Sequence, residues 1–414
     1  MMYEHVRVPL EQTLSEDLYR LFSGDIIHRL LREGRVESGP DELMGLLEGH
    51  SFRISERLAP RLDKICRSVQ KSLAFEEPLE FFVVSSSEMN CSAVPRVEDD
   101  RNHLVLINSE LLERFDEGEL RFVLGHEIGH LLSRSADLQR IISFVFPEGS
   151  ELPQVFSNKV ELWHKLAELS ADRFGFIASP DLGTCVRAFI KMASGLDATR
   201  LTFDPAAYIE EMERIIQYFH DQPATIHSAH PINPIRVKAL QHFSDSALYR
   251  SVAEGGPLAE DTELKTKVDA LLDLLLQVGH SELDTWRKQF IASGGLLVAG
   301  MDGALNLDEM DRIVGPLAYF TSEPQAYLRE VLEGGKVQER FVEAVERILE
   351  LNPSERYQMF GFLIDLVLAD QDIDPREVDV LFQIGEAAFG LAGKEIAQQI
   401  GEAVQKNFVP RLSR

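Results

Sequence analysis

The chain has 414 residues, of which 44% are hydrophobic and 27% are charged, a composition typical of a soluble globular protein. Its formal net charge of -26 argues against nucleic acid and anionic membrane surfaces as partners. The sequence contains no run of about 18 uncharged apolar residues, so we predict no membrane-spanning segment. Three widely spaced cysteines without a CxxC pair, and an N-terminus without an apolar leader, lead us to expect a cytoplasmic protein.

The first 55 residues predict a helical N-terminal extension. Within residues 15–34, helical spacing places seven apolar side chains along one side: Leu18, Leu21, Phe22, Ile26, Ile27, Leu30 and Leu31. Residues 39–49 form a second short amphipathic pattern. No residue there suggests chemistry, so we expect this extension to pack against the domain that follows.

Helices and strands alternate after the extension. A helix is predicted over residues 55–73, and two segments rich in β-branched and aromatic residues, 79–86 and 103–109, predict strands. Asp116 followed by Glu119 is a capping-box pattern, which predicts that the next helix starts there. Strands therefore precede this helix in the chain.

A long helix is predicted over residues 153–178, and the apolar segment 138–156 leads into it. This segment is too short and too interrupted to span a membrane. It predicts either a lid over a cleft or ordinary core packing, and its residues favour neither.

The elements together predict an α+β, mostly helical fold with a small sheet and an all-α C-terminal domain. The N-terminal extension (1–55) precedes the domain with the sheet (56–250). Residues 251–264 are polar and contain glycine and proline, which indicates a linker. Residues 265–408 predict the all-helical C-terminal domain.

The stretch FVLGHEIGHLLS carries His126, Glu127 and His130 in the order His-Glu-x-x-His. A helix turns by about 100° per residue, so the two histidines lie about 40° apart and about 6 Å apart along the axis, where both can reach one metal ion. Zinc suits imidazole ligands, and a catalytic zinc site keeps one position for water. Glu127 projects beside the histidines and can take a proton from that water. The pattern predicts one zinc ion per chain.

A catalytic zinc needs a third protein ligand, and the segment AELSADRFG offers Glu168 and Asp172 on one helical face. Glu168 can complete a His/His/Glu set, and Asp172 can accept a hydrogen bond from a ligand histidine and fix its tautomer. Taken alone, a Glu and an Asp four residues apart are more often two solvent-exposed charges than parts of a metal site. The segment SAHPINPIR adds His230 and Arg236, which could stabilise an oxyanion. Taken alone, His230 is more often a loop histidine at a helix start.

Over about residues 56–250, these segments resemble the zinc metallopeptidases of the HtpX and CAAX-prenyl-protease type, which form metallopeptidase family forty-eight among the gluzincins. The resemblance implies a zincin-like metallopeptidase core. It also implies a role for each residue named above. His126, His130 and Glu168 would be the zinc ligands and Glu127 the general base, Asp172 would support a ligand histidine by a hydrogen bond, and His230 and Arg236 would bind substrate and stabilise the oxyanion.

The stretch MNCSAV resembles the family's Asn-Ala-Phe-Ala strand, which pairs with extended substrate. Asn90 matches the asparagine and is implied to bind substrate, whereas Cys91, Ser92 and Val94 depart from the family residues. Family members commonly carry transmembrane or membrane-associated segments around this core, and this sequence departs from them in that respect too.

A weak internal repeat marks the C-terminal domain, where an Asp is twice followed seven residues later by a Glu: Asp302 with Glu309, and Asp370 with Glu377. Neither segment is an EF-hand loop, because the glycine at position six and the glutamate at position twelve are missing. The repeat resembles the tellurite-resistance TerB-like domain, which is all-helical and carries acids that can bind metal. It implies a second metal site at these four acids, and helix capping is the alternative explanation.

Two hypotheses of different classes follow. The first is a soluble zinc-dependent metalloendopeptidase that hydrolyses protein or peptide substrates and carries a TerB-like domain. The alternative is a regulatory sensor or scaffold whose C-terminal domain binds a protein partner or metal, with the zinc domain weakly active or inactive. A zinc hydrolase with a substrate other than a peptide is a third hypothesis.

Overall fold

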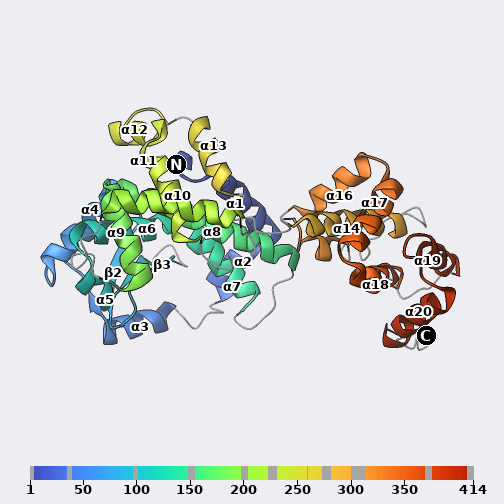
Figure 1. The fold of residues 1–414 in the computed structure, drawn as a ribbon. Helices are drawn as coiled ribbons and strands as arrows, with labels where there is room; N and C mark the ends of the chain where they lie inside the picture. Colours follow the sequence, from blue (N-terminus) through green and yellow to red (C-terminus); the bar gives the residue numbers. More distant parts are fainter. Residues whose placement is uncertain are drawn as a thin grey trace. The chain divides into compact units, whose positions relative to one another are not determined.

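The computed structural model describes the following residues: 4–34, 40–96, 101–147, 154–196, 204–221, 231–258, 260–272, 281–299, 313–321, 323–368 and 375–407. The chain divides into two compact units, which are described separately: unit 1 comprises Met1–Glu151 and Lys159–Leu276, and unit 2 comprises Leu152–Asn158 and Gln277–Arg414. The described residues are mostly helical, with one small mixed sheet, which confirms the predicted α+β class (Figure 1).

The elements of unit 1 follow the predicted order of an N-terminal helical extension, strands and then long helices. In chain order they are η1 (Glu4–Val6), α1 (Pro9–Leu21), α2 (Gly24–Gly34), α3 (Pro40–His50), β1 (Phe52–Arg53), α4 (Pro60–Ser72), β2 (Leu79–Val84), β3 (Cys91–Val94), β4 (His103–Asn108), α5 (Ser109–Arg114), α6 (Glu117–Leu132), α7 (Ser135–Val145), α8 (Gln154–Ala178), α9 (Leu182–Ser194), α10 (Pro205–Asp221), α11 (Asn233–Ser244), α12 (Ala247–Glu254) and α13 (Thr262–Leu272).

The sheet has the strand order β1-β2-β4-β3. β2 and β4 are parallel, with Phe81 opposite Val105, and β1 and β3 are antiparallel to their neighbours. The two strands predicted from β-branched and aromatic residues are the central pair, and Phe81 and Val105 are fully buried. β3 lies at one edge, so one side of its backbone has no neighbouring strand within the sheet.

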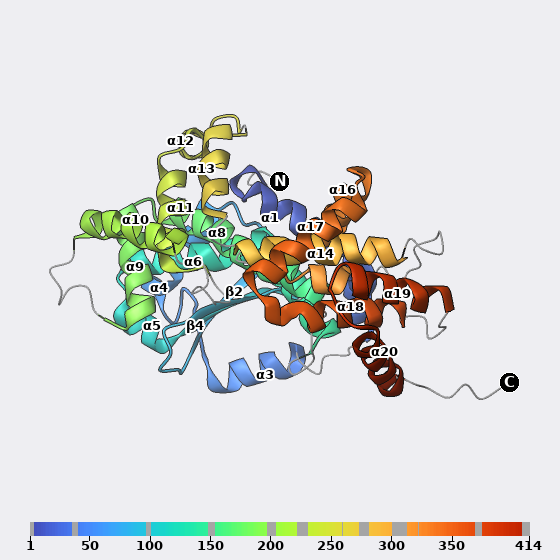
Figure 2. The ribbon, with the colours of Figure 1, turned by 45° about the vertical axis from the view of Figure 1, so that its right-hand side comes forward.

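Helices cover both faces of this sheet (Figure 2). On one face, Leu47 of α3 packs with Phe82 and Leu104 in a small buried cluster. α6 contacts β3 and β4, and α4 packs against α6. The helix with the His-Glu-x-x-His motif is therefore held beside the edge strand.

α6 and α8 approach closely because glycines lie where they meet. A Cβ added to Gly125 of α6 would lie 2.6 Å from the Ala178 Cβ, and one added to Gly175 of α8 would lie 2.8 Å from the Phe122 carbonyl oxygen. Both distances are shorter than any normal carbon contact, so no larger residue fits without moving a helix. The two helices that carry the predicted metal ligands are brought together in this way.

The N-terminal extension differs from its predicted form. Ser23 adopts a left-handed conformation with φ 50°, which ends α1 and starts α2 on a new axis. The apolar residues of 15–34 therefore do not share one face: Leu18 and Leu31 are buried, whereas Ile26 is 61% exposed. α4 also begins later than predicted, at Pro60.

The described part of the apolar segment 138–156 packs as core rather than as a separate lid. Leu138, Ile141 and Ile142 of α7 are buried, and α7 contacts α1, α2 and α6. Residues 148–153 lie outside the described part of the chain. No helix among the described residues is long and apolar enough to cross a membrane.

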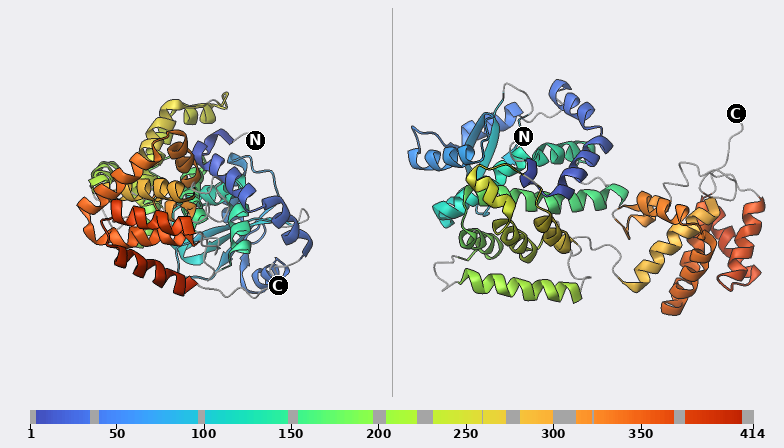
Figure 3. Two further views of the ribbon diagram at one scale, coloured as in Figure 1. Left: turned by 90° about the vertical axis from the view of Figure 1, so that its right-hand side faces the viewer. Right: turned by 90° about the horizontal axis from the view of Figure 1, so that it is seen from above.

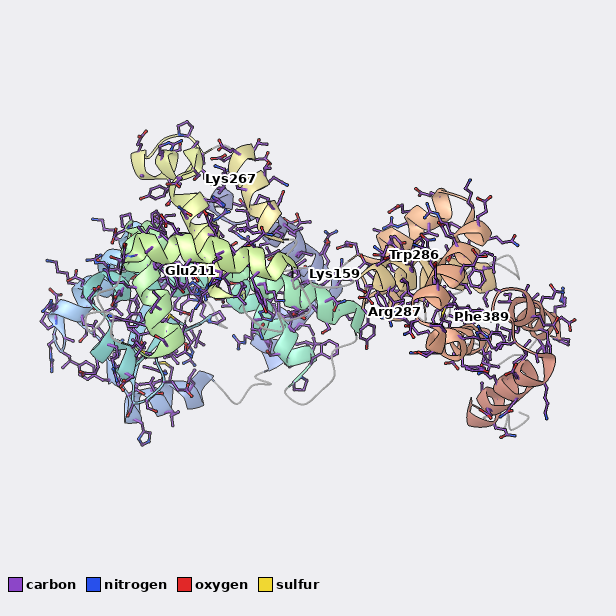
Figure 4. All side chains as sticks on the ribbon, viewed as in Figure 1. Lys159, Glu211, Lys267, Trp286, Arg287 and Phe389 are labelled. Carbon is purple, nitrogen blue, oxygen red and sulfur yellow. The ribbon has the colours of Figure 1, made fainter. Side chains whose placement is uncertain are left out.

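The described residues of unit 2 are helical, and α14 and α17 pack along each other (Figure 3). The elements are α14 (Glu282–Ala299), α16 (Pro324–Glu333), α17 (Val337–Leu351), η4 (Pro353–Glu355), α18 (Arg356–Val367), α19 (Pro375–Ala387) and α20 (Gly393–Asn407). The Phe389 ring, labelled in Figure 4, lies among Phe290, Phe341 and Phe360 in one buried cluster. α13, at the start of the predicted C-terminal domain, belongs to unit 1.

Candidate metal centre and cleft

The helix that presents the two histidines starts at the predicted capping box. The Asp116 carboxylate accepts a hydrogen bond from the Glu119 backbone N–H (2.9 Å), and the Glu119 carboxylate accepts one from the Asp116 N–H (2.9 Å). Lys191 of α9 donates to Glu119 Oε2 at 2.7 Å, and both side chains are buried. This buried ion pair fixes the first turn of α6 against α9.

His126, His130 and Glu168 converge on one point between α6 and α8. The two Nε2 atoms are 3.1 Å apart, His126 Nε2 is 3.6 Å from Glu168 Oε2, and His130 Nε2 is 3.4 Å from Glu168 Oε1. A tetrahedral zinc site with ligand distances of about 2.0–2.1 Å separates its ligand atoms by about 3.3–3.4 Å. The three side chains therefore fit one zinc ion, and among the described residues they form the candidate metal-binding group.

The other imidazole nitrogens have hydrogen-bond partners that fix both tautomers. His126 Nδ1 lies 2.9 Å from Asp172 Oδ1, and His130 Nδ1 lies 2.8 Å from Ser135 Oγ. The Ser135 hydroxyl donates to the His130 carbonyl oxygen, so it accepts from Nδ1–H. Both Nε2 atoms then present lone pairs to each other, an arrangement that is repulsive unless a cation lies between them. The donor set thus favours a bound metal ion.

Arg236 of α11 binds the two acids of α8. Its Nε donates to Asp172 Oδ2 at 2.8 Å and its Nη2 to Asp172 Oδ1 at 2.6 Å, while Nη2 lies 3.3 Å from Glu168 Oε2. Its guanidinium also packs 4.8 Å from the centre of the Phe189 ring. Burial would raise the pKa of Glu168, but the positive charge of Arg236, together with the adjacent imidazoles of His126 and His130, lowers it well below its usual value. Glu168 is therefore held as a carboxylate.

Glu127 occupies a different environment from Glu168. Burial raises the pKa of Glu127 to about 7, with a further contribution from the negative charge of Glu168. The adjacent imidazole of His130 and a hydrogen bond from the Ala93 backbone N–H act in the opposite direction. A carboxyl group with a pKa near neutrality can both accept and release a proton.

A cleft of about 450 Å³ opens over these residues. Asn90 and the first three residues of β3 form one wall, and Met192 and Arg236 lie on other walls. The lining is completed by Phe122, Val123, His126, Glu127, His130, Ser135, Ala136, Gln139, Trp163, His164, Ala167 and Glu168. The open edge of the sheet therefore borders the candidate metal centre.

Not every predicted site residue falls in the described part of the chain. His230, Asp302, Glu309 and Asp370 lie outside the described residues. Glu377 is in the first turn of α19. The structure brings the remaining predicted residues together around the cleft: Asn90, His126, Glu127, His130, Glu168, Asp172 and Arg236.

Three further residues contribute to the site and were missed from the sequence. Ser135 orients His130, while Trp163 and Met192 line the cleft. Ser135 follows Arg134, which has φ 57°, and this left-handed turn directs the start of α7 back toward His130. No sequence pattern marks that turn, so helical spacing alone could not find Ser135.

Comparison with known proteins agrees with this geometry. Residues 56–148 match peptidase family M48, a stretch that includes Asn90 and the His-Glu-x-x-His motif and ends before Glu168. The plastoglobule-localized metallopeptidase 48, chloroplastic, of Arabidopsis thaliana is 22% identical over 227 residues, which cover 51% of this chain and 65% of that relative. No solved structure matches the chain. Residues 56–148 are therefore similar to peptidase family M48, which supports a metallopeptidase.

Proposed function

We propose that this protein is a zinc-dependent metalloendopeptidase with a zincin-like core. The observation that carries the proposal is the convergence of His126, His130 and Glu168 beside Glu127, within a cleft bordered by the edge strand β3. A zinc ion held by these three residues would lower the pKa of a water molecule and polarise a peptide carbonyl.

The residues around the proposed zinc ion have separate roles in proton transfer and in ligand orientation. Glu127, which lines the cleft beside His126 and His130, would accept the proton of the attacking water and pass it to the leaving nitrogen. Asp172 and Ser135 hold the two imidazoles in the tautomer that presents Nε2 to the metal. Arg236 holds Asp172 through two hydrogen bonds and balances the negative charge of Glu168.

The substrate is proposed to bind as an extended chain along β3. The Asn108 N–H donates to the Asn90 carbonyl, so in the antiparallel ladder the backbone groups of Cys91 and Ala93 point away from β4. Asn90 Oδ1 accepts from the Cys91 N–H at 2.9 Å and Glu127 accepts from the Ala93 N–H, so the carbonyl oxygens of these two strand residues are the groups proposed to meet the substrate. An open strand edge recognises a peptide main chain, which favours peptides over other hydrolase substrates.

The proposed oxyanion donors are His230 and Arg236. Arg236 lines the cleft, but its Nε and Nη2 already donate to Asp172, so we assign it first to orientation of that carboxylate. His230 remains a prediction from the sequence. The TerB-like assignment of the C-terminal domain, its second metal site, its protein partner and the cytoplasmic location also remain predictions.

The test compares the wild type with Glu127→Ala and with Glu117→Ala, which changes an exposed glutamate on the same helix. Zinc per chain and chelator-sensitive cleavage of an unfolded protein such as casein are measured for each. We expect one zinc in all three proteins and cleavage by the wild type and Glu117→Ala only. Cleavage by Glu127→Ala would contradict the assigned base, and a wild type without zinc would contradict the proposed function.

A further inference from the structure

The N-terminal extension contains a carboxylate that is completely buried. Glu11 of α1 has no exposed surface. Its carboxylate accepts hydrogen bonds from Arg7 Nε and Nη2 (both 2.8 Å), from Ser15 Oγ (2.7 Å) and from Ser170 Oγ of α8 (3.2 Å). A buried carboxylate is retained only where charge and hydrogen bonds offset its desolvation. One of its three partner residues, Ser170, belongs to the helix that carries Glu168 and Asp172.

Further hydrogen bonds join the same two segments. The Val8 N–H donates to Ser170 Oγ (3.0 Å), and the Trp163 indole N–H donates to Ser15 Oγ (2.9 Å). Arg173 Nη1 donates to the Val6 carbonyl (2.9 Å). Ser170, Trp163 and Arg173 are all buried. η1 and α1 are thus bonded to α8 at three positions along its length.

The bonded face of α8 lies opposite its ligand face. Ser170 is two residues from Glu168 and two from Asp172, and two residues correspond to a rotation of about 200° about the helix axis. Both acids therefore project away from the side that α1 holds. No described residue before Asn90 lines the cleft, so the described part of the extension does not cover the metal centre.

We propose that residues 4–21 set the rotation of α8 that presents Glu168 and Asp172 to α6, with Glu11 and Ser170 as positioning residues. A rotation of α8 about its axis would move Glu168 and Asp172 on one side of the helix and would break the hydrogen bonds of Ser170 on the other side. Formation of the Glu11–Ser170 bond therefore selects the rotation in which Glu168 faces His126 and His130. The inference rests on the proposed metal site.

Trp163 extends this link to the cleft itself. Its indole lines the cleft, packs 4.7 Å from the centre of the His164 ring, and is held by Ser15 Oγ. The hydroxyl of α1 thereby fixes one wall of the space in which the substrate is proposed to bind. The extension therefore supports the site from behind α8 and does not block the cleft.

The experiment uses full-length Glu11→Gln and Ser170→Ala. Glu80→Gln is the matched control, since Glu80 is a largely buried glutamate of the same unit that pairs with Arg53 at the sheet. Zinc affinity is measured by competition with a chelator, and visible absorption is recorded after Co²⁺ replaces zinc, because that spectrum reports coordination geometry. Thermal midpoints are recorded for all proteins.

We expect Glu11→Gln to raise the zinc dissociation constant by up to about tenfold, the lower end of the effect of removing a direct hydrogen-bond partner of a metal ligand, because Glu11 acts through Ser170, and to alter the Co²⁺ spectrum. Ser170→Ala should change the zinc dissociation constant and the Co²⁺ spectrum in the same direction, but by a smaller amount. If Glu11→Gln does not fold, Ser170→Ala alone tests the inference. Glu80→Gln should lower the thermal midpoint without changing the spectrum. If Ser170→Ala bound zinc as tightly as the wild type and gave the same Co²⁺ spectrum, the inference would be overturned. If the wild type itself bound no zinc, the proposed function would be overturned instead.

Discussion

At the scale of single residues, the two histidines proposed as metal ligands are oriented in different ways. His126 donates to a buried carboxylate, Asp172, whereas His130 donates to a hydroxyl, Ser135. A carboxylate partner strengthens the basicity of an imidazole more than a neutral oxygen does. His126 would therefore be the better electron donor to a bound metal ion, and the position of His130 depends on one serine.

Ser135→Ala should weaken zinc binding while leaving the fold intact. The change removes the acceptor that holds the His130 Nδ1–H, so the ring can rotate or change tautomer. We expect a rise in the zinc dissociation constant of about tenfold or more, measured by chelator competition. Ser143→Ala is the control, because Ser143 is an exposed serine on the same helix. Equal zinc affinity in the two variants would show that Ser135 does not orient His130.

At the scale of helices, the metal centre depends on how closely α6 and α8 approach. Gly125→Ala would place a methyl group 2.6 Å from the Ala178 Cβ and 3.0 Å from the Phe174 carbonyl oxygen, so the helices must separate. We expect a loss of stability of about 1–3 kcal/mol, as is typical of overpacking, together with weaker zinc binding. Denaturant unfolding and chelator competition measure the two effects.

Gly45→Ala supplies the comparison for that prediction. Gly45 lies within α3, where an added Cβ meets nothing within 4 Å. Alanine is favoured over glycine in a helix by about 1 kcal/mol, so this variant should be as stable as the wild type or more stable. If Gly125→Ala behaved like Gly45→Ala, close packing of the two ligand helices would not be needed for the site.

The connection between α12 and α13 depends on one carboxylate. Asp261 Oδ2 accepts from the Leu248 N–H (3.1 Å) and Oδ1 from the Leu264 N–H (2.9 Å), so it caps two helices at once. Partial burial raises the pKa of Asp261, but these N–H donors, together with those of Ala247 and Glu263, lower it below its usual value. The sequence suggested a linker over residues 251–264. The hydrogen bond from the Leu248 N–H to Asp261 joins residues thirteen positions apart, so no local sequence pattern predicts this packing.

Asp261→Asn should therefore reduce stability in a pH-dependent way. A carboxyl whose pKa is lower in the folded state stabilises the fold above its unfolded pKa of about 3.9, and that stabilisation is lost as the pH falls through the folded value. We expect the variant to be less stable by about 1 kcal/mol at neutral pH, as for the loss of a helix cap. The difference should shrink below about pH 4, and urea unfolding at several pH values measures it. A difference that stayed constant down to pH 3 would rule out the carboxylate as its source.

At the scale of the whole molecule, the sequence predicted the elements better than their arrangement. β2, β4, the start of α6 and the placing of His126 beside His130 follow from local composition and helical spacing, whereas the choice of Glu168 as third ligand also rests on the family resemblance. Ser135, Trp163 and the buried Glu11 do not, because their roles depend on contacts between segments far apart in the chain. A glutamate in an amphipathic helix is read as surface charge unless the partner that buries it is known.

The two units should also unfold separately. The buried cluster of unit 2 is built from residues of unit 2 alone, with Phe360 fully buried at its centre, whereas the candidate metal ligands all belong to unit 1. A ligand stabilises only the structure that binds it, by about 2.7 kcal/mol at a hundredfold excess over its dissociation constant. We therefore expect two calorimetric transitions, of which a chelator lowers one by about 5–10 °C.

Phe360→Ala identifies the other transition. Removing a fully buried phenylalanine destabilises a core by about 3–5 kcal/mol, so this variant should lower the transition that the chelator leaves unchanged. Because the two perturbations act on different cores, their effects should add when they are combined. A single transition that both perturbations lower would mean that the metal centre and the C-terminal helices unfold as one cooperative structure, and the C-terminal domain would then contribute directly to metal retention.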